Sequence, residues 1–472
     1  MSDVRISKDA GSSSPSGFFK LLPFANALLV VTALYSAGWC LFSFVDHKPQ
    51  LYLKVVPAAV ALVAVLALLL RPAAKILATS VFVGAAIGIY ATELVALGLL
   101  DQGRSAGEAV RSAAKEDGVP YDARRKIEVI EDLRRKNLPA YPPFYPHLTF
   151  AAPLQIDGGP VIPLGSIAHV ITVCCNEGGQ YLEYTTDERG FANPSGLWSQ
   201  APIDVALVGA SIAVGECVPA GDSIAGTLRA RYPKTISLGG GGNGPFLELA
   251  SVVEYLPLLK PRRVLWVFSE SHTPDYLDRE RHVPLLERYL DGSFSQNLAN
   301  RQESIDRAVG AYLESAVQLE LHPKQISLRQ HAVDWASLRQ VRTLVSGREV
   351  RAAAVDRARL QTSLYEQILR RGKQIVDGWG GQITILYVPD TSRYPGAFGY
   401  TPALRLVYDQ TRAAVAATAA GLGIPVIDIS RRFPDSPVSQ ASQYTQFFYN
   451  YPAHFKPAGY RLMDKAILEE LQ

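Results

Sequence analysis

The stretch that decides the fold is Ile203–Ser211, which reads IDVALVGAS. Its centre, residues 205–208, is apolar without interruption, as in a parallel strand that is buried on both faces. The Gly-Ala-Ser that follows would place Ser211 at the carboxyl end of this strand. In open α/β sheets, ligands bind at that edge. Ser211 is therefore a candidate nucleophile or, alternatively, the cap of the next helix.

The chain beyond Ser211 alternates between strand and helix patterns. Further strands are expected at 234–238, 263–268, 383–388 and 425–429. Helices are expected near 222–231, 246–259, 402–420 and 457–471, and a long, mainly helical insertion over roughly 280–378. Strands that alternate with helices predict an α/β domain with a parallel sheet covered on both faces.

Three turns rich in glycine or serine follow the first three strands. They are Gly209–Ser211, Gly239–Pro245 and Ser269–Asp275. In a parallel sheet these turns converge on one edge. Near the C-terminus, His454–Tyr460 (HFKPAGY) precedes the last expected helix.

These blocks, in this order, resemble the SGNH (GDSL-like) hydrolase superfamily over roughly residues 203–472. The context, with TTDERGFANP at 185–194, VLWVFSES and HFKPAGYRL, looks most like the membrane-anchored members found with bacterial exopolysaccharide machinery. The resemblance implies a flavodoxin-like three-layer α/β fold. It also implies a serine esterase, deacetylase or O-acyltransferase that acts on acyl groups of a cell-surface polysaccharide or glycolipid, with no cofactor and no metal.

The resemblance assigns roles to individual positions. Ser211 falls at the nucleophile and His454 at its general base. Gly242 falls at the glycine whose backbone N–H donates to the oxyanion. His272 stands where the family has an asparagine, and an imidazole N–H can also donate there. Tyr451 stands where the family has the acid, so the acid partner of His454 is unknown and a Ser–His dyad is one possibility.

Two other classes of function stay open. The missing acid and the changed asparagine also fit a catalytically weak, membrane-anchored accessory or binding protein of polysaccharide assembly on the same fold. Separately, Gly239, Gly241 and Gly244 satisfy the G-x-G-x-x-G pattern of dinucleotide-binding proteins, with Glu270 as the ribose-binding acid. That acid comes later than the roughly 20-residue spacing of the pattern, which makes this alternative weaker.

Residues 1–103 read as a membrane module. Three apolar runs, at about 21–45, 51–70 and 76–100, predict three transmembrane helices because each can reach the roughly 20 residues that cross a bilayer. Arg5, Lys8 and Lys20 precede the first run and favour a cytoplasmic N-terminus. Three spans would place the rest of the chain outside the cytoplasm, at a bacterial inner membrane.

The segments between the membrane module and the α/β domain are shorter. Residues 104–146 predict a charged stalk helix and a proline-rich linker, and residues 147–202 a small β-rich extension. The four cysteines are interpreted as small buried apolar residues; a disulfide between two of them is possible, but the spacing does not indicate one.

The near-neutral balance of charge, +3 over 472 residues, argues against nucleic acid as a partner. The expected partners are the acylated glycan, the lipid bilayer and other membrane proteins of polysaccharide biosynthesis.

Overall fold

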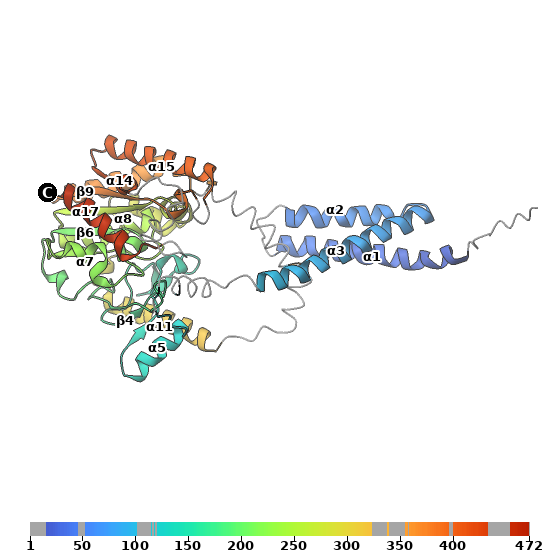
Figure 1. The fold of residues 1–472 in the computed structure, drawn as a ribbon, viewed down its shortest axis with the longest axis horizontal. Helices are drawn as coiled ribbons and strands as arrows, with labels where there is room; N and C mark the ends of the chain where they lie inside the picture. Colours follow the sequence, from blue (N-terminus) through green and yellow to red (C-terminus); the bar gives the residue numbers. More distant parts are fainter. Residues whose placement is uncertain are drawn as a thin grey trace, which may run out of the picture. The chain divides into compact units, whose positions relative to one another are not determined.

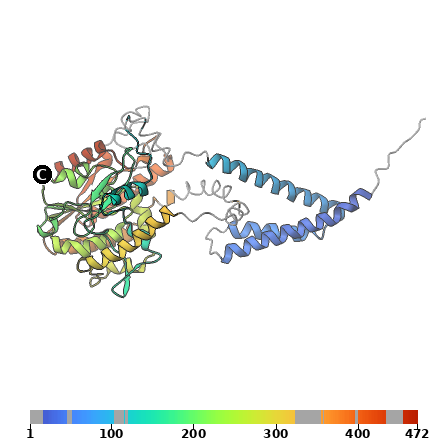
Figure 2. The ribbon, with the colours of Figure 1, turned by 90° about the horizontal axis from the view of Figure 1, so that it is seen from below.

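The computed structural model describes residues 16–45, 52–101, 120–322, 358–395, 400–432 and 454–471, with isolated positions 115, 118, 338, 355 and 356. The chain forms two compact units. One comprises residues 1–103 with 327–345, and the other comprises 104–326 with 346–472. Figures 1 and 2 show the helices of the first unit and the layered sheet of the second.

The first unit contains three helices, α1 (Ser16–Val45), α2 (Tyr52–Ala67) and α3 (Pro72–Asp101). The helices α1 and α3 run in the same direction. The hydroxyl of Thr79 donates to the carbonyl of Ala25 over 3.5 Å, and further along both helices the Tyr35 and Tyr90 hydroxyls lie 2.7 Å apart. Many apolar side chains of these helices face outward, among them Phe24 at 71% exposure.

The prediction of three transmembrane helices is wrong for the described residues. Two helical segments there, Lys20–Leu41 and Pro72–Val95, are long and apolar enough to cross a membrane. The apolar part of α2 covers only Lys54–Ala67. The whole of α2 has 16 residues, about 24 Å of helix at 1.5 Å per residue, which falls short of the ~30 Å hydrocarbon core.

The second unit is built on a five-stranded parallel sheet. Its strands are β6 (Val205–Val208), β7 (Thr235–Ser237), β8 (Arg263–Ser269), β9 (Gln382–Val388) and β10 (Val426–Asp428). Their order is β10-β9-β8-β6-β7, with every pair parallel. Numbered along the chain and read from β7, this is 2-1-3-4-5, the flavodoxin-like order. The predicted α/β fold with a parallel sheet is therefore confirmed.

Successive side chains of β6 enter different cores because a strand alternates between its two faces. Ala206 and Val208 belong to one cluster, and Val205 and Leu207 to the other. The first cluster is completed by α8 (Pro245–Leu259), α14 (Thr362–Asp377) and α15 (Pro402–Gly421). The second is completed by α6 (Ser211–Val214), α7 (Ile224–Leu228) and α17 (Pro457–Glu470). This double burial explains why the β6 sequence is apolar without alternation.

Smaller elements accompany the main sheet. A second sheet has the order β1-β4-β5, formed by β1 (Ala140–Tyr141), β4 (Ile171–Val173) and β5 (Glu183–Thr185), and β2 (Leu154–Ile156) pairs with β3 (Gly159–Val161). The other α-helices of the described residues are α5 (Lys126–Arg135), α9 (His272–Glu280), α10 (Pro284–Glu287) and α11 (Gln302–Leu321). Short 3-10 turns lie at Pro146–Thr149, Leu197–Ser199, Ala220–Asp222, Arg288–Leu290, Leu298–Asn300, Thr391–Arg393 and Ile429–Arg431.

Candidate active site

Ser211 begins α6 directly after the central strand β6. The strand order reverses at β6, which lies between β7 and β8, so Ser211 stands at the topological switch point where α/β sheets bind ligands. Gly209 makes the turn with a φ of +156°. A Cβ on Gly209 would lie 2.8 Å from the Cβ of Val267 and 3.0 Å from that of Ala213. The tight turn therefore requires glycine.

The glycine-rich loop after β7 packs against this turn. The N–H of Gly240 donates to the carbonyl of Gly209 over 3.1 Å. Gly242 has a φ of +75°, and a Cβ there would lie 2.5 Å from the His147 imidazole. A Cβ on Gly241 would overlap the ring of Tyr145 and the carboxylate of Glu216. The loop containing Gly242 thus lies beside the turn that carries Ser211.

His454 lies before α17 and is held by a carboxylate that sequence reasoning did not identify. Its Nδ1 lies 2.7 Å from Oε1 of Glu177, which is on the connection between β4 and β5. Its Nε2 lies 3.8 Å from Oε2 of Glu216. The imidazole is 20% exposed, and the two carboxylates are 9% and 10% exposed. The family acid position, Tyr451, lies outside the described residues.

The two carboxylates shift the titration of His454. Burial alone would lower its pKa, but the hydrogen bond and charge of Glu177, together with the charge of Glu216, outweigh burial and raise it. Burial raises the pKa of Glu216, against the opposing charges of His454 and Lys126. The pair of carboxylates therefore stabilises the imidazolium form of His454.

A disulfide joins the Glu177 hairpin to the Ser211 turn. Cys175 is bonded to Cys217, with the two Cα atoms 5.5 Å apart and 42 positions apart in sequence. Cys217 follows Glu216 directly, and Cys175 precedes Glu177 by two residues. The expectation that Cys175 and Cys217 are small apolar residues is wrong, because they form a disulfide. The sequence left a bridge possible but did not indicate this pair, since a separation of 42 positions is no pairing signal. Cys174 remains a buried thiol.

His272 begins α9 at the end of β8. Its Nδ1 lies 3.5 Å from the Ser269 hydroxyl, and its ring stacks on Tyr276 with centroids 5.4 Å apart. Burial lowers the pKa of His272, opposed by the charge of Asp390, and the charge of His454 lowers it further. A neutral imidazole that accepts from Ser269 carries its proton on Nε2, which can then donate to an oxyanion.

A chain of contacts through Glu216 links Ser211 to His454, the candidate nucleophile and its candidate base. The N–H groups of Gly215 and Glu216 both donate to the carbonyl of Ser211 over 3.0 Å, so the turn carrying Glu216 starts at the serine. Glu216 in turn approaches Nε2 of His454. Within the part of the chain that the structure describes, the Ser211 hydroxyl and His454 form no hydrogen bond. Nucleophile and base are often further apart without substrate.

The groups with which the dinucleotide alternative would bind its ligand already have partners within the protein. The carboxylate of Glu270 is fully buried and accepts from Tyr387, Arg393 and the N–H of Asp390. The N-terminus of α8 is already occupied, because Glu280 accepts from the N–H of Gly244 over 2.6 Å. A ribose hydroxyl or a pyrophosphate would have to displace these buried carboxylate contacts.

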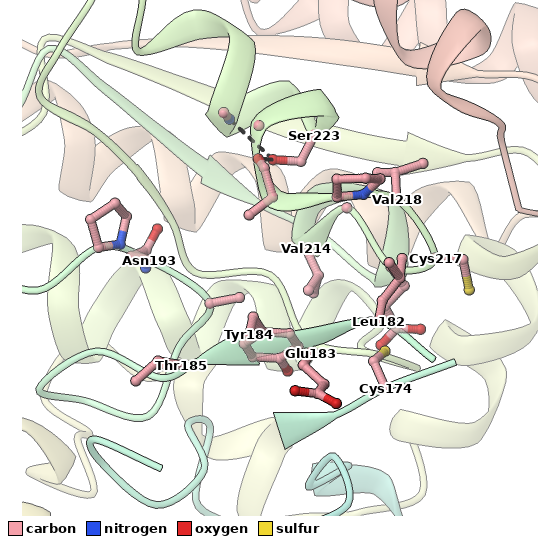
Figure 3. A pocket seen from close by; sticks show the side chains of 18 of the residues that line it. Cys174, Leu182, Glu183, Tyr184, Thr185, Asn193, Val214, Cys217, Val218 and Ser223 are labelled. Atoms are coloured by element: carbon pink, nitrogen blue, oxygen red, sulfur yellow. Dashed lines mark hydrogen bonds between the residues drawn. The ribbon is translucent and has the colours of Figure 1, made fainter. Parts of the chain in front are cut away.

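A cavity of about 470 Å³ lies beside the candidate active site. Figure 3 shows its walls, formed by the β5 side chains around Tyr184 and by the segment from Val214 to Ser223. Of the site residues, it is lined by Glu216 and Cys217 and not by Ser211, His454, Gly242 or His272.

Residues 221–223 read Gly-Asp-Ser, the triplet of the family that the sequence resembles, and Ser223 of this triplet lines the cavity wall as a helix cap. Its hydroxyl accepts from the N–H of Gly226 over 3.0 Å, as the dashed line in Figure 3 shows. Ser223 therefore caps α7.

One cluster has the residue types of a metal site. The ligand atoms of Glu177, Cys217 and His454 lie within 4.8 Å of one another. The Cys217 sulfur is, however, bonded to Cys175 and is no thiolate. The cluster then retains one imidazole and one carboxylate that already bind each other.

Comparison with known proteins gives similarity at the level of structure only. No family model matches the chain, and no curated protein matches it. Similar solved structures are esterases and acylhydrolases. A GDSL-like lipase from Bacteroides thetaiotaomicron is 10% identical, with 58% of this chain and 93% of that chain covered and a TM-score of 0.32. A variant of an acetylxylan esterase from Geobacillus stearothermophilus is 13% identical, with 58% and 95% covered and a TM-score of 0.30.

Proposed function

We propose that this chain is a membrane-anchored serine esterase or O-acyltransferase of SGNH type that acts on acyl groups of a cell-surface polysaccharide or glycolipid. One observation carries the proposal. Ser211 stands at the switch point of a flavodoxin-like sheet, and the turn that it begins leads through Glu216 to a carboxylate-bound histidine, His454. A nucleophile, a base and an orienting carboxylate at one sheet edge are the parts that acyl transfer requires.

The proposed reaction runs in two halves. The Ser211 oxygen attacks the acyl carbonyl carbon while its proton passes to Nε2 of His454. The negative charge on the former carbonyl oxygen is held by the N–H groups of Ser211 and Gly242 and by Nε2–H of His272. His454 then returns the proton to the departing alcohol oxygen, which leaves an acyl-serine. Water or a second hydroxyl, deprotonated by His454, releases the acyl group.

Replacement of the nucleophile tests the proposal. Ser211→Ala in the full chain, purified in mild detergent, should abolish hydrolysis of p-nitrophenyl acetate because the proposed acyl intermediate forms on the Ser211 oxygen. Ser223→Ala is the matched control, since Ser223 lies in a literal Gly-Asp-Ser triplet but caps α7. The control should keep its turnover. Equal turnover in wild type and Ser211→Ala would contradict the proposal.

A second candidate is a catalytically weak accessory protein of polysaccharide assembly. It is favoured by the position of Glu216, whose carboxylate approaches the nitrogen that should face Ser211. A serine-directed fluorophosphonate distinguishes the two. Labelling that depends on Ser211 supports the enzyme, whereas glycan binding without labelling supports the accessory protein.

We also propose that the sheet unit faces an oxidising compartment outside the cytoplasm of a bacterial cell. The disulfide supports this, because such bonds persist in oxidising compartments. Other membrane proteins of polysaccharide biosynthesis are the proposed partners, and an acyltransferase would need one to deliver its acyl group.

A further inference from the structure

Glu177 contacts His454 although the two residues lie far apart in the sequence. It lies 277 positions before the histidine, on the connection between two strands of the small sheet, outside the five-stranded sheet. Its Oε1 nevertheless accepts from Nδ1 of His454 at 2.7 Å, a short, charge-assisted distance. The Glu177 side chain is 9% exposed, so water competes little for this contact.

We propose that Glu177 is the positioning acid of the active site, and that the Cys175–Cys217 disulfide holds it against His454. This inference rests on the proposed function of Ser211 and His454. The carboxylate fixes the proton of the imidazole on Nδ1, which leaves the lone pair of Nε2 available for the proton of the Ser211 hydroxyl. The carboxylate keeps its negative charge while the His454 imidazolium forms and then gives up its proton, as the acid of a serine triad does.

The hairpin that carries Glu177 is built to keep the carboxylate in place. The N–H of Cys174 donates to the carbonyl of Leu182 over 2.8 Å, and the N–H of Leu182 donates to the carbonyl of Cys175 over 3.0 Å. These two hydrogen bonds continue the pairing of β4 and β5 toward the hairpin loop. The side chain of Asn176 donates to the carbonyl of Asp122 over 2.9 Å. The disulfide then ties the hairpin to the turn after Ser211.

Three titratable groups face His454 from three different elements. They are Glu177 from the β4–β5 hairpin, Glu216 from the turn after α6 and His272 from α9. Of the two carboxylates, Glu177 lies within hydrogen-bond distance of the imidazole, whereas Glu216 is 3.8 Å from Nε2. Glu177 can therefore fix the tautomer of His454, whereas Glu216 acts on it through charge alone.

The sign of the pH effect follows from this arrangement. A general base works in its neutral form, and the carboxylates raise the pKa of His454 above its ordinary value. In the wild type, the acid limb of kcat/KM should therefore lie above pH ~6.5, the ordinary histidine value. Removing the charge of Glu177 should move that limb to lower pH.

The test compares Glu177→Gln with Glu183→Gln in the full chain in detergent. Glu183 is an exposed carboxylate on the same hairpin and makes the matched control. Glu177→Gln should lower kcat about 10²- to 10⁴-fold with little change in KM, the range expected when the base loses its orienting acid. Its acid limb should move to lower pH. Glu183→Gln should change neither quantity, and Glu177→Asp should recover part of kcat.

A second readout separates this inference from the proposed function. In protein with 13C-labelled histidine, the His454 resonance, assigned with His454→Ala, should titrate at lower pH in Glu177→Gln than in wild type. An unchanged His454 pKa, or a wild-type kcat in Glu177→Gln while Ser211→Ala is inactive, would overturn the role of Glu177 alone. Full activity in Ser211→Ala would instead overturn the proposed function.

Discussion

At the scale of single residues, Gly209 fixes the position of the candidate nucleophile. Its φ of +156° and the nearby Cβ atoms of Val267 and Ala213 leave space for a hydrogen atom only. The chain can therefore leave β6 and enter α6 within two residues, with Ser211 at the sheet edge. This local requirement explains a glycine at 209 whether or not Ser211 is a nucleophile.

Gly209→Ala should destabilise the protein by about 1–3 kcal/mol, because the new methyl group meets rigid neighbours in a strained backbone conformation. Thermal unfolding of the full chain in detergent measures the loss. Gly221→Ala is the control, since a Cβ there meets nothing within 4 Å and its φ is not in the left-handed region. Equal melting temperatures for the two variants would show that the turn accommodates a side chain.

At the scale of elements, the β4–β5 hairpin belongs to the small sheet but places the Glu177 carboxylate at His454, beside the five-stranded sheet. The two strands pair antiparallel, from Ile171 with Thr185 to Val173 with Glu183. The hairpin reaches His454 through the residues beyond that pairing, and one covalent bond connects it to the Ser211 turn. The small sheet is thus part of the candidate active site.

Reduction of the Cys175–Cys217 disulfide should lower both turnover and stability. In the chain-entropy account, a disulfide that closes a loop of this length stabilises the folded state by up to about 4 kcal/mol. Breaking the bond would also free the hairpin, and Glu177 with it, from His454. Esterase activity and melting temperature, with and without a phosphine reductant, measure the two effects. The Cys175→Ser/Cys217→Ser variant should be insensitive to the reductant. Wild-type turnover that persists after complete reduction would show that the hairpin holds its place without the bond.

At the scale of the whole molecule, the chain combines an apolar helical unit with a sheet unit that contains a disulfide. Large outward-facing apolar side chains, such as Leu34 at 69% exposure and Val81 at 63%, suit a lipid environment rather than water. The disulfide suits an oxidising compartment.

Alkaline phosphatase fused to the C-terminus should be active in a bacterial host, because the proposed location of the sheet unit is outside the cytoplasm, where that reporter folds. A fluorescent protein fused to the N-terminus should fluoresce, in line with the cytoplasmic side expected for Arg5, Lys8 and Lys20. An inactive phosphatase together with a fluorescent C-terminal fusion would place the sheet unit in the cytoplasm.

Much of the fold was accessible from the sequence because its signals are local. The apolar run 205–208 predicts a strand buried on both faces, and the alternation after it predicts the parallel sheet that the structure confirms. The prediction of a membrane span over 51–70 was wrong. Apolar composition does not define where a helix ends, and α2 ends at Ala67.

The sequence by itself determined the central strand, the tight Gly-Ala-Ser turn and the blocks that nominate Ser211 and His454, because each depends on a few adjacent residues. Only the tertiary structure decided which carboxylate binds the histidine. Glu177 and His454 are 277 positions apart, and Cys175 and Cys217 are 42 apart. Such pairs have no fixed spacing along the chain, since folding alone brings them within reach of each other.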